Sequence, residues 1–374
     1  MKKVMQYIFV FVFLSIITLP LVFFDRKSVI SEQENRTLAT FPDVIDDGKL
    51  STNVIKKFPG LLDAYLSDRI GFKNKAIAFT NKITRAGKLR QGDVILGKNK
   101  WLYYVSPWDG DNLSDYLKTN LFSQDEISSF IEQIEKRALW CKENGIHFLF
   151  VIAPNKHSVY PEYYPFDRPD GITRTEQIIN ALPDSLKDTV IFPRDYIISQ
   201  KAKYPYPFYY EDDTHWNAKG AYFAYEIILP KLKTAFSNSV LPAIDYDETV
   251  SFAPAHGDLI GMLGVKTSGQ RTFIALTPKE GLKYRYIKKD GRNGVITENE
   301  NQALPKALVF RDSFFSALEP FTSNIFSHTE YIWGPVPAYF NDTDKDFILE
   351  YKPDIIIWEM VERCIDGIPY STWN

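Results

Sequence analysis

The stretch IHFLFVIAP, residues 146–154, decides the fold class of this 374-residue chain. Almost every side chain in it is apolar, which is typical of a strand in a parallel sheet that helices cover on both faces. The residues before it predict a helix that begins at Ser123, which forms a Ser-x-x-Glu capping box with Glu126. The same helix is expected to stop at Asn144 and Gly145. A helix that leads directly into a buried strand is the repeating unit of an α/β protein.

The same alternation recurs toward the C-terminus. A helix is expected over residues 173–182 and a strand over residues 189–193, and a further helix spans about residues 218–232. Short apolar runs at residues 307–310 and 354–358 predict two more buried strands. This alternation predicts an open, doubly wound parallel sheet, and such sheets bind their ligands at the carboxyl ends of the strands.

The N-terminal residues 1–27 predict a membrane anchor. An apolar run from Tyr7 to Phe24 follows Lys2 and Lys3 and is just long enough to span a bilayer. No small-x-small cleavage site follows it, so the segment is expected to stay uncleaved. The short basic tail and the long downstream chain favour an N-terminus inside the cell. The rest of the protein is then expected on the outer side of the membrane.

The rest of the chain is expected to form a linker and one large domain. Residues 28–50 have no sustained period of 2 or 3.6 and predict the linker. The domain covers residues 51–374 and opens with a helical region from about residue 52 to 88. Between about residues 237 and 305 the pattern becomes polar, glycine-rich and strand-like, which predicts an inserted β-rich segment.

The composition excludes nucleic acid as a partner, and the cysteines show neither a metal-binding pattern nor a dense disulfide framework. The net charge is -3 from 44 basic and 47 acidic residues, so there is no polycationic face for nucleic acid. The two cysteines, Cys141 and Cys364, are far apart in sequence and are expected to be free, buried thiols, although a single disulfide stays open.

One histidine stands in a sequence that suits general base chemistry. His215 lies in YEDDTHWNAKG, residues 210–220, two residues after Asp213 and at the expected start of a helix. A carboxylate beside an imidazole fixes the tautomer of the ring and stabilises it once it has taken a proton. The alternative is that these acids only cap the helix, as acids commonly do at such positions.

One serine stands where a nucleophile is expected. In ALVFRDSFFSAL, residues 307–318, an apolar strand ends at Arg311 and Asp312, and Ser313 falls on the turn into a helix. A serine at such a turn is exposed above the sheet edge, where backbone N–H groups can stabilise an oxyanion. The alternative is that Ser313 is an ordinary helix N-cap.

Taken in this order, the two motifs resemble those of the alginate O-acetyltransferase group of the SGNH hydrolase superfamily, also called DHHW proteins. An Asp-x-His-Trp motif marks the group and is matched here by Asp213, His215 and Trp216; a later Asp-Ser-Phe turn is matched by Asp312–Phe314. Ordinary SGNH enzymes carry the serine first, so the order resembles a permuted arrangement. Further similar segments cover nearly the whole chain after the anchor: Glu34–Arg36 with Leu38, Phe41 and Pro42; Gly97–Tyr103; Pro154–Lys156 with Tyr160–Glu162; Gly257–Leu259; and Glu362 with Arg363.

The resemblance implies an SGNH-hydrolase-like α/β fold and a catalytic triad of Ser313, His215 and Asp213. Asp212 stands at the acid spacing of ordinary SGNH enzymes and remains the alternative orienting acid. The usual Gly and Asn blocks of the superfamily are not evident. The oxyanion donors are therefore expected to be the backbone N–H of Ser313 and Asn155, which ends its strand.

Three further residues complete the candidate oxyanion and substrate-binding set. They are Lys156, Arg311 and Trp216. Asn155 and Lys156 could equally shape their loop, and Arg311 could contact an anionic substrate or pair with a neighbouring acid.

Neither a metal nor a cofactor is expected. The chain has no Gly-rich phosphate loop, and its other histidines are scattered without ligand spacing: His147, His157, His256 and His328.

The resemblance implies an extracytoplasmic O-acetyltransferase of the cell membrane or periplasm that acts by double displacement on an exopolysaccharide or cell-envelope polysaccharide. The acetyl group is expected to arrive through a multipass membrane-bound O-acyltransferase, beside which the anchor would hold the domain. A carbohydrate acetylesterase is one alternative, because water could take the acyl group. A noncatalytic polysaccharide-binding or assembly protein on the same scaffold is the alternative from another class.

Overall fold

The chain divides into two compact units in the computed structural model. The larger unit consists of Ile95–Pro254 and Gly269–Asn374, and the smaller unit of Met1–Val94 and Ala255–Ser268. The structure describes residues 7, 11, 13–15, 18–20, 22–31, 36–42, 45–46, 49–50, 52–72, 90–107, 109–254, 256–265, 270–289, 294–333, 340–371 and 373.

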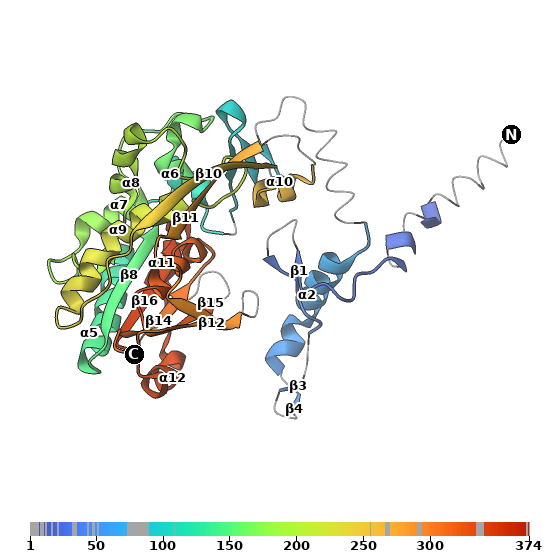
Figure 1. Cartoon of the computed structure of the whole chain (residues 1–374). Coiled ribbons are helices and arrows are strands. Elements are labelled where there is room, and N and C mark those ends of the chain that lie inside the picture. The colour runs from blue at the N-terminus through green and yellow to red at the C-terminus, as the bar shows by residue number, and fades with distance from the viewer. Residues whose placement is uncertain are drawn as a thin grey trace. The chain divides into compact units, whose positions relative to one another are not determined.

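A seven-stranded, mostly parallel sheet forms the centre of the larger unit (Figure 1). Its strand order is β12-β13-β15-β14-β16-β8-β9, in which β15, β14, β16, β8 and β9 are parallel and β12 and β13 add an antiparallel edge. The α/β fold expected from the sequence is therefore confirmed. The strands are β8 His147–Ala153, β9 Val190–Ile191, β12 Tyr284–Lys289, β13 Val295–Asn299, β14 Lys306–Arg311, β15 His328–Trp333 and β16 Ile355–Val361.

The middle strands are buried, and most of their side chains are apolar. Every residue of β16 is buried, and in β8 only His147 is exposed. Trp358 in the centre of the sheet pairs in register with Phe150 on one side and Phe310 on the other. The rings of Phe150 and Trp358 lie 4.8 Å apart, so large aromatic side chains fill the core at the middle of the sheet.

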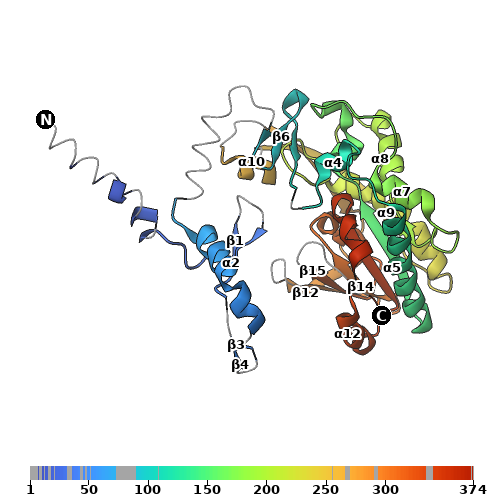
Figure 2. The same ribbon diagram turned by 180° about the vertical axis from the view of Figure 1, so that it is seen from behind.

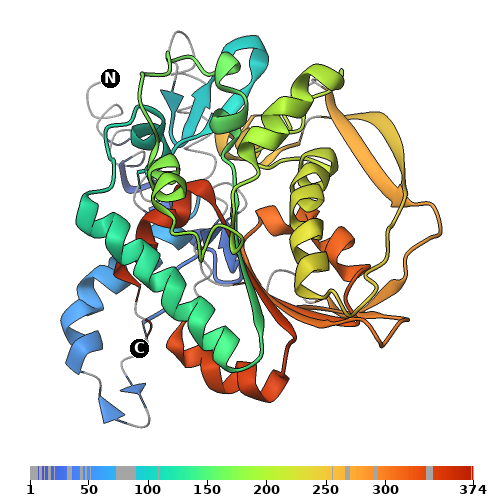
Figure 3. The same ribbon diagram turned by 90° about the vertical axis from the view of Figure 1, so that its left-hand side faces the viewer.

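Helices cover both faces of this sheet, and Figure 3 shows α5 and α9 on opposite sides of it. The capping box expected at the start of α5 is present: Ser123 Oγ accepts from the N–H of Glu126, and the Glu126 side chain accepts from the N–H of Ser123. The C-cap of α5 is Asn144, as expected. The helices of this unit are α4 Asn112–Tyr116, α5 Gln124–Glu143, α6 Lys156–Val159, α7 Arg174–Ala181, α8 Arg194–Gln200, α9 Ala218–Ala235, α11 Glu319–Ser323 and α12 Lys345–Tyr351.

The C-terminal 3-10 segment η6, Glu362–Tyr370, follows β16 and packs on α5 (Figure 2). The hydroxyl of Ser129 on α5 donates to the carbonyl oxygen of Pro369 at 2.6 Å. Cys364 in this segment and Cys141 in α5 are both free and buried, as the sequence predicted. Burial raises the pKa of both thiols, that of Cys141 to about 12, so neither is a reactive thiolate at neutral pH.

The β-rich stretch after α9 contributes to the fold in two ways. Strands β10, Tyr246–Pro254, and β11, Gln270–Pro278, form a two-stranded antiparallel ribbon, and β11 packs against α9. An ion pair of 2.7 Å between Lys219 on α9 and Glu248 on β10 ties the ribbon down. The remaining strands, β12 and β13, are not a separate insertion, because they extend the central sheet.

The smaller unit is built around α2, Thr52–Arg69. The Arg69 side chain at its end donates to the carbonyl oxygens of Asp25, Ser28 and Ala39, so the chain before the helix is fixed on its last turn. The expected helical region therefore exists up to residue 69, and residues 73–89 lie outside the described part. The other elements are β1 Ile30–Ser31, β2 Arg36–Thr37, β3 Ile45–Asp46, β4 Lys49–Leu50, β5 Arg90–Gln91 and α10 Asp258–Leu263, with β6 Val94–Leu96 at the boundary and β7 Leu102–Tyr104 in the larger unit.

Among the described residues, no helix is both long enough and apolar enough to cross a membrane. Much of the expected anchor, at residues 1–6, 8–10, 12, 16–17 and 21, lies outside the described residues.

Candidate active site

The turn that carries Ser313 is fixed by a fully buried carboxylate. After β14 ends at Arg311, one oxygen of Asp312 accepts from the N–H of Phe314 at 2.8 Å, and the other accepts from the N–H of Val361 at 2.7 Å. Val361 is the last residue of β16, so Asp312 ties the turn to the neighbouring strand. Ser313 precedes the 3-10 helix η4, Phe314–Ala317, and its side chain makes no capping hydrogen bond. The hydroxyl is therefore not used as an N-cap.

The loop that carries His215 is closed on itself before α9. Tyr209 and Trp216 form an isolated antiparallel bridge across it. The N-cap of α9 is Asn217, whose side-chain oxygen accepts from the N–H groups of Lys219 and Gly220. A Cβ atom at Gly220 would lie 2.5 Å from the carbonyl oxygen of Phe208, so the loop and helix can approach this closely only with glycine there. Since Asn217 caps the helix, the acids before His215 are available for other contacts.

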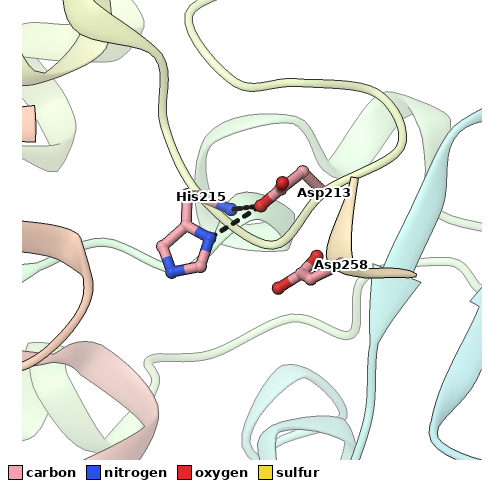
Figure 4. Close-up of side chains that lie close together, drawn as sticks. All are labelled: Asp213, His215 and Asp258. Carbon is pink, nitrogen blue, oxygen red and sulfur yellow. Dashed lines mark hydrogen bonds and ion pairs between the residues drawn. The ribbon is translucent and has the colours of Figure 1, made fainter. Parts of the chain in front are cut away.

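Asp213, His215 and Ser313 form one chain of hydrogen bonds. Asp213 Oδ1 lies 2.6 Å from Nδ1 of the imidazole and also accepts from the backbone N–H of His215 at 3.1 Å (Figure 4). The other ring nitrogen, Nε2, lies 2.7 Å from Ser313 Oγ. With the Nδ1 proton directed at the carboxylate, Nε2 is left to accept the proton of the serine hydroxyl. The three residues predicted to act together are thus in direct contact, although Ser313 and His215 are 98 positions apart.

Asp213, the acid in this chain of hydrogen bonds, is held in its ionised form. Burial opposes ionisation of Asp213, but the charge and hydrogen bonds of His215 outweigh it, and the charge of Arg271 adds to them. Together they hold the pKa of Asp213 well below its usual value. A carboxylate that stays charged can stabilise an imidazolium when the ring takes up a proton.

Arg271 was not predicted from the sequence. It lies on β11, where its Nη1 is 3.4 Å from Asp212 Oδ1 and 3.5 Å from Asp213 Oδ2. It lies 56 residues beyond His215, inside the β-rich stretch, and no recognisable motif surrounds it. The only signal was indirect: two adjacent acids that are buried together require a cation nearby.

The triad opens into a pocket of about 370 Å³ in the larger unit. Of the predicted substrate-binding residues, Trp216 and Arg311 line it. Trp216 is almost fully buried and donates from Nε1 to the carbonyl oxygen of Phe314 at 2.9 Å, so it joins the two loops of the site. The pocket is lined by Tyr210, Asp213, His215, Trp216, Arg311, Ser313, Phe314, Ser316, Ala317 and Trp333.

Arg311 borders the pocket and also pairs with a neighbouring acid. Its guanidinium donates to the hydroxyl of Ser316 at 2.8 Å and lies over the ring of Trp333, 4.6 Å from the centroid, so it borders the pocket. It also pairs with the carboxylate of Glu319 at 3.7 Å. The side chain is buried, so much of its charge is offset within the protein.

Asn155 and Lys156 lie at the same edge of the sheet but do not line this pocket. The backbone N–H of Asn155 donates to Glu362 Oε2 at 2.8 Å. Lys156 Nζ donates to the carbonyl oxygens of Tyr210 and Asp213, at 2.9 and 2.6 Å, and to that of Glu211 at 3.2 Å. Lys156 therefore supports the backbone of the loop that carries the acid.

The helix start after Ser313 offers few backbone donors for an oxyanion. The N–H of Phe314 is already bonded to Asp312, so it cannot also serve a substrate. The N–H of Ser313 remains the expected donor. Beneath the turn, Glu359 accepts from the N–H of Asp312 at 3.1 Å, and burial raises its pKa well above the usual value.

An acid, an imidazole and a serine hydroxyl in one hydrogen-bonded chain, at the carboxyl edge of a mostly parallel α/β sheet, define an SGNH-hydrolase-like protein. Residues 94–301 match the family described as "SGNH hydrolase-like domain, acetyltransferase AlgX", which is more than half of the chain, and the chain belongs to this family. The matched range contains Asp213 and His215 and ends before Ser313. The resemblance noted from the two motifs is thereby confirmed.

Three solved structures that are similar to this chain are distant from it in sequence. PatB1 of Bacillus cereus is 18% identical, with a TM-score of 0.52, over 75% of this chain and 97% of that one. The O-acetyltransferase domain of Pseudomonas putida AlgJ is 17% identical, with a TM-score of 0.47, over 75% and 94%. A DHHW family protein from Eubacterium siraeum is 15% identical, with a TM-score of 0.48, over 75% and 95%. No curated protein sequence matches the chain.

Proposed function

We propose that this chain is an extracytoplasmic O-acetyltransferase that moves acetyl groups to hydroxyls of an exopolysaccharide or cell-envelope polysaccharide through an acyl-serine. One observation carries the proposal: Asp213, His215 and Ser313 form a hydrogen-bonded chain that opens into a pocket, in a member of the acetyltransferase AlgX family. In this proposal Ser313 is the nucleophile, His215 the general base and Asp213 the orienting acid.

In the first half of the reaction, Ser313 Oγ attacks the carbonyl carbon of an acetyl donor while His215 Nε2 takes the hydroxyl proton. The bond between the acetyl carbon and the donor oxygen then breaks, and His215 returns the proton to that oxygen. The ionised carboxylate of Asp213 stabilises the imidazolium between these two transfers. The backbone N–H of Ser313 is the proposed donor to the oxyanion.

In the second half, a sugar hydroxyl of the acceptor gives its proton to His215 Nε2 and attacks the acetyl-serine. The ester bond to Ser313 Oγ breaks, and the serine regains a proton from the imidazolium. Arg311 and Trp216 line the pocket and are proposed to contact the donor or the acceptor. Asn155 and Lys156 are proposed to support the site from the adjoining loop.

The proposed location follows from the N-terminal sequence. Residues 1–27 would anchor the chain in the cell membrane, residues 28–50 would form the linker, and residues 51–374 would form the catalytic domain on the outer or periplasmic side. Acetyl-coenzyme A is cytoplasmic, so the acetyl group would be delivered across the membrane by a multipass O-acyltransferase. The anchor would keep the domain beside that partner.

The direct test measures release and transfer of acetyl from a chromogenic acetyl ester by the detergent-solubilised full chain, with and without added glycans. The wild type should release acetyl, and Ser313→Ala should not. Acetylated glycan among the products supports a transferase, whereas release to water alone with every glycan tested supports the acetylesterase alternative. Equal rates in wild type and Ser313→Ala would leave a noncatalytic polysaccharide-binding protein as the better interpretation.

A further inference from the structure

We propose that Arg271 is a positioning residue of the active site: it offsets the charge of Asp212 and holds Asp213 in the orientation that His215 requires. This inference rests on the proposed function, because it assigns a role within the same triad. Arg271 belongs to β11, and nothing in the two sequence motifs points to it.

The geometry gives each oxygen of Asp213 its own partner. Oδ1 faces His215, with the imidazole Nδ1 at 2.6 Å and the backbone N–H at 3.1 Å. Oδ2 faces Nη1 of Arg271 at 3.5 Å. Rotation of the carboxylate away from the imidazole would separate Oδ2 from the guanidinium, so the arginine restrains the orientation of the acid.

The same guanidinium nitrogen also approaches the neighbouring acid, since Asp212 Oδ1 lies at 3.4 Å. Asp212 is 6% and Arg271 8% exposed, so water contributes little screening at this point. Two adjacent buried carboxylates repel each other, and the repulsion would favour protonation or displacement of one of them. A single cation placed between the two removes most of that repulsion and leaves Asp213 charged beside the imidazole.

Arg271 is itself held in place. Its guanidinium lies over the ring of Tyr210, with the central carbon 3.8 Å from the ring centroid. Tyr210 is in the same loop as the two acids, and its ring also stacks with that of Phe273, which is on the same face of β11 as Arg271. The ribbon β10–β11 therefore holds the guanidinium of Arg271 at a fixed position beside the loop. Arg271 is not among the residues that line the pocket.

These contacts predict a specific pattern of kinetic effects in the full chain. Arg271→Met should lower kcat for the chromogenic acetyl ester at least about tenfold, the factor that corresponds to one pKa unit of lost charge stabilisation. KM should change little, because the side chain does not border the pocket. Arg271→Lys should retain part of the rate, since it keeps the charge but loses the stacking of the planar guanidinium on the ring of Tyr210, which fixes the position of that charge.

A double variant separates charge compensation from simple support of the fold. In the Arg271→Met background, Asp212→Asn removes one of the two uncompensated carboxylates and should restore a substantial part of kcat. If Arg271 only held the ribbon in place, the second substitution would restore nothing. Arg285→Met is the matched control, because Arg285 is an exposed arginine of β12 that pairs with Glu298, and it should leave kcat unchanged.

A spectroscopic measurement decides the inference without relying on turnover. The Asp213–His215 hydrogen bond should give a far-downfield imidazole proton signal in the NMR spectrum of the wild type, absent from His215→Gln. Arg271→Met should shift or remove that signal, and the double variant should restore it. A wild-type signal and wild-type kcat in Arg271→Met would overturn the inference and leave the triad standing. If the wild type turned over ester no faster than Ser313→Ala, the proposed function would fail while the NMR result still decided the role of Arg271.

Discussion

Asp212 and Asp213 are adjacent in the chain and share Arg271, and Asp213 also contacts the imidazole of His215. Asp213 Oδ1 lies 2.6 Å from Nδ1 of His215, whereas Asp212 Oδ1 lies 3.4 Å from Nη1 of Arg271. The sequence predicted a carboxylate beside His215 and left both acids open, because spacing alone does not show which way each side chain turns. The hydrogen-bond geometry favours Asp213.

This difference gives a prediction for the two amide substitutions. Asp213→Asn should lower kcat by roughly a thousandfold to ten-thousandfold, because an amide can hold the imidazole in the wrong tautomer. Asp212→Asn should cost less than about tenfold, since Arg271 and Asp213 remain in place. Steady-state hydrolysis of a chromogenic acetyl ester measures both. A larger loss in Asp212→Asn than in Asp213→Asn would reverse the assignment of the acid.

The buried His157 should make the free energy of unfolding depend on pH. Burial lowers its pKa to about 3, and the charges of Arg168 and Arg363 act in the same direction. The unfolded chain takes up this proton as the pH falls through 6.5, whereas the folded chain does not until about pH 3. In this window the histidine should therefore lower the free energy of unfolding by about 1.4 kcal/mol for each pH unit of acidification.

Urea unfolding between pH 3 and 7 tests this pH dependence. In His157→Phe the ring is replaced by one that cannot take a proton, among the rings of Tyr116 and Tyr164 that surround it. The stability of this variant should fall less steeply with acid than that of the wild type, by about one proton. His147→Phe, at an exposed histidine of β8, is the control and should keep the wild-type slope. Equal slopes in all three proteins would contradict a buried, neutral His157.

At the scale of elements, the loop before α9 depends on one buried lysine. Lys156 donates to three carbonyl oxygens, those of Tyr210, Glu211 and Asp213. The ammonium also lies over the rings of Trp101 and Tyr103, so the lysine is enclosed by the loop on one side and aromatic rings on the other. This support reaches the acid of the triad through the backbone.

Removal of that support should weaken both the fold and the activity. Lys156→Met removes one charged donor shared by three carbonyl oxygens, of which that of Glu211 keeps the N–H of Leu102, and we expect it to lower the free energy of unfolding by about 2–4 kcal/mol. The value of kcat should fall with it, because the loop carries Asp213. Lys187→Met removes an exposed lysine that pairs with Asp184 and should change stability by less than about 0.5 kcal/mol. A stable Lys156→Met protein with wild-type kcat would show that the loop holds its shape without the lysine.

Local signals predicted the helix α5 and the strand β8 almost to the residue. The capping box and the run of apolar side chains act within a few positions of the chain, so they can be recognised without the fold. The strands β13 and β15 carry mixed sequences, VITEN and HTEYIW. β13 falls in the stretch that was expected to be β-rich, but its place in the central sheet was not predicted, and neither was β15. They are strands because the sheet supplies their neighbours, and that pairing is set by the rest of the fold.

At the scale of the whole molecule, the fold explains how distant motifs meet. His215 precedes α9 and Ser313 follows β14, and the ribbon β10–β11 with the sheet edge β12–β13 lies between them in sequence. The motifs themselves predicted the meeting of acid, base and nucleophile. The residues that complete the site, Arg271 on β11 and Trp333 on β15, come from elements whose placement the sequence did not reveal.

The proposed anchor predicts that the whole chain is bound to the membrane. Expressed full-length in bacteria, it should sediment with membranes and resist alkaline extraction, because the apolar run of residues 7–24 would lie in the bilayer. Deletion of residues 2–27 should release a protein that retains ester hydrolysis. Full-length protein in the soluble fraction, or deleted protein that still resists extraction, would contradict the anchor.

Trapping the acetyl-serine intermediate shows whether the acetyl group passes through Ser313. The full chain is mixed with an acetyl ester, quenched in acid within the first turnover, digested and mapped by mass spectrometry. We predict one acetyl group on the peptide that contains Ser313, its loss when a glycan acceptor is added before the quench, and no such adduct in Ser313→Ala. Turnover of the ester by the wild type with no acetyl on that peptide, or with the same adduct in Ser313→Ala, would contradict the acyl-serine mechanism.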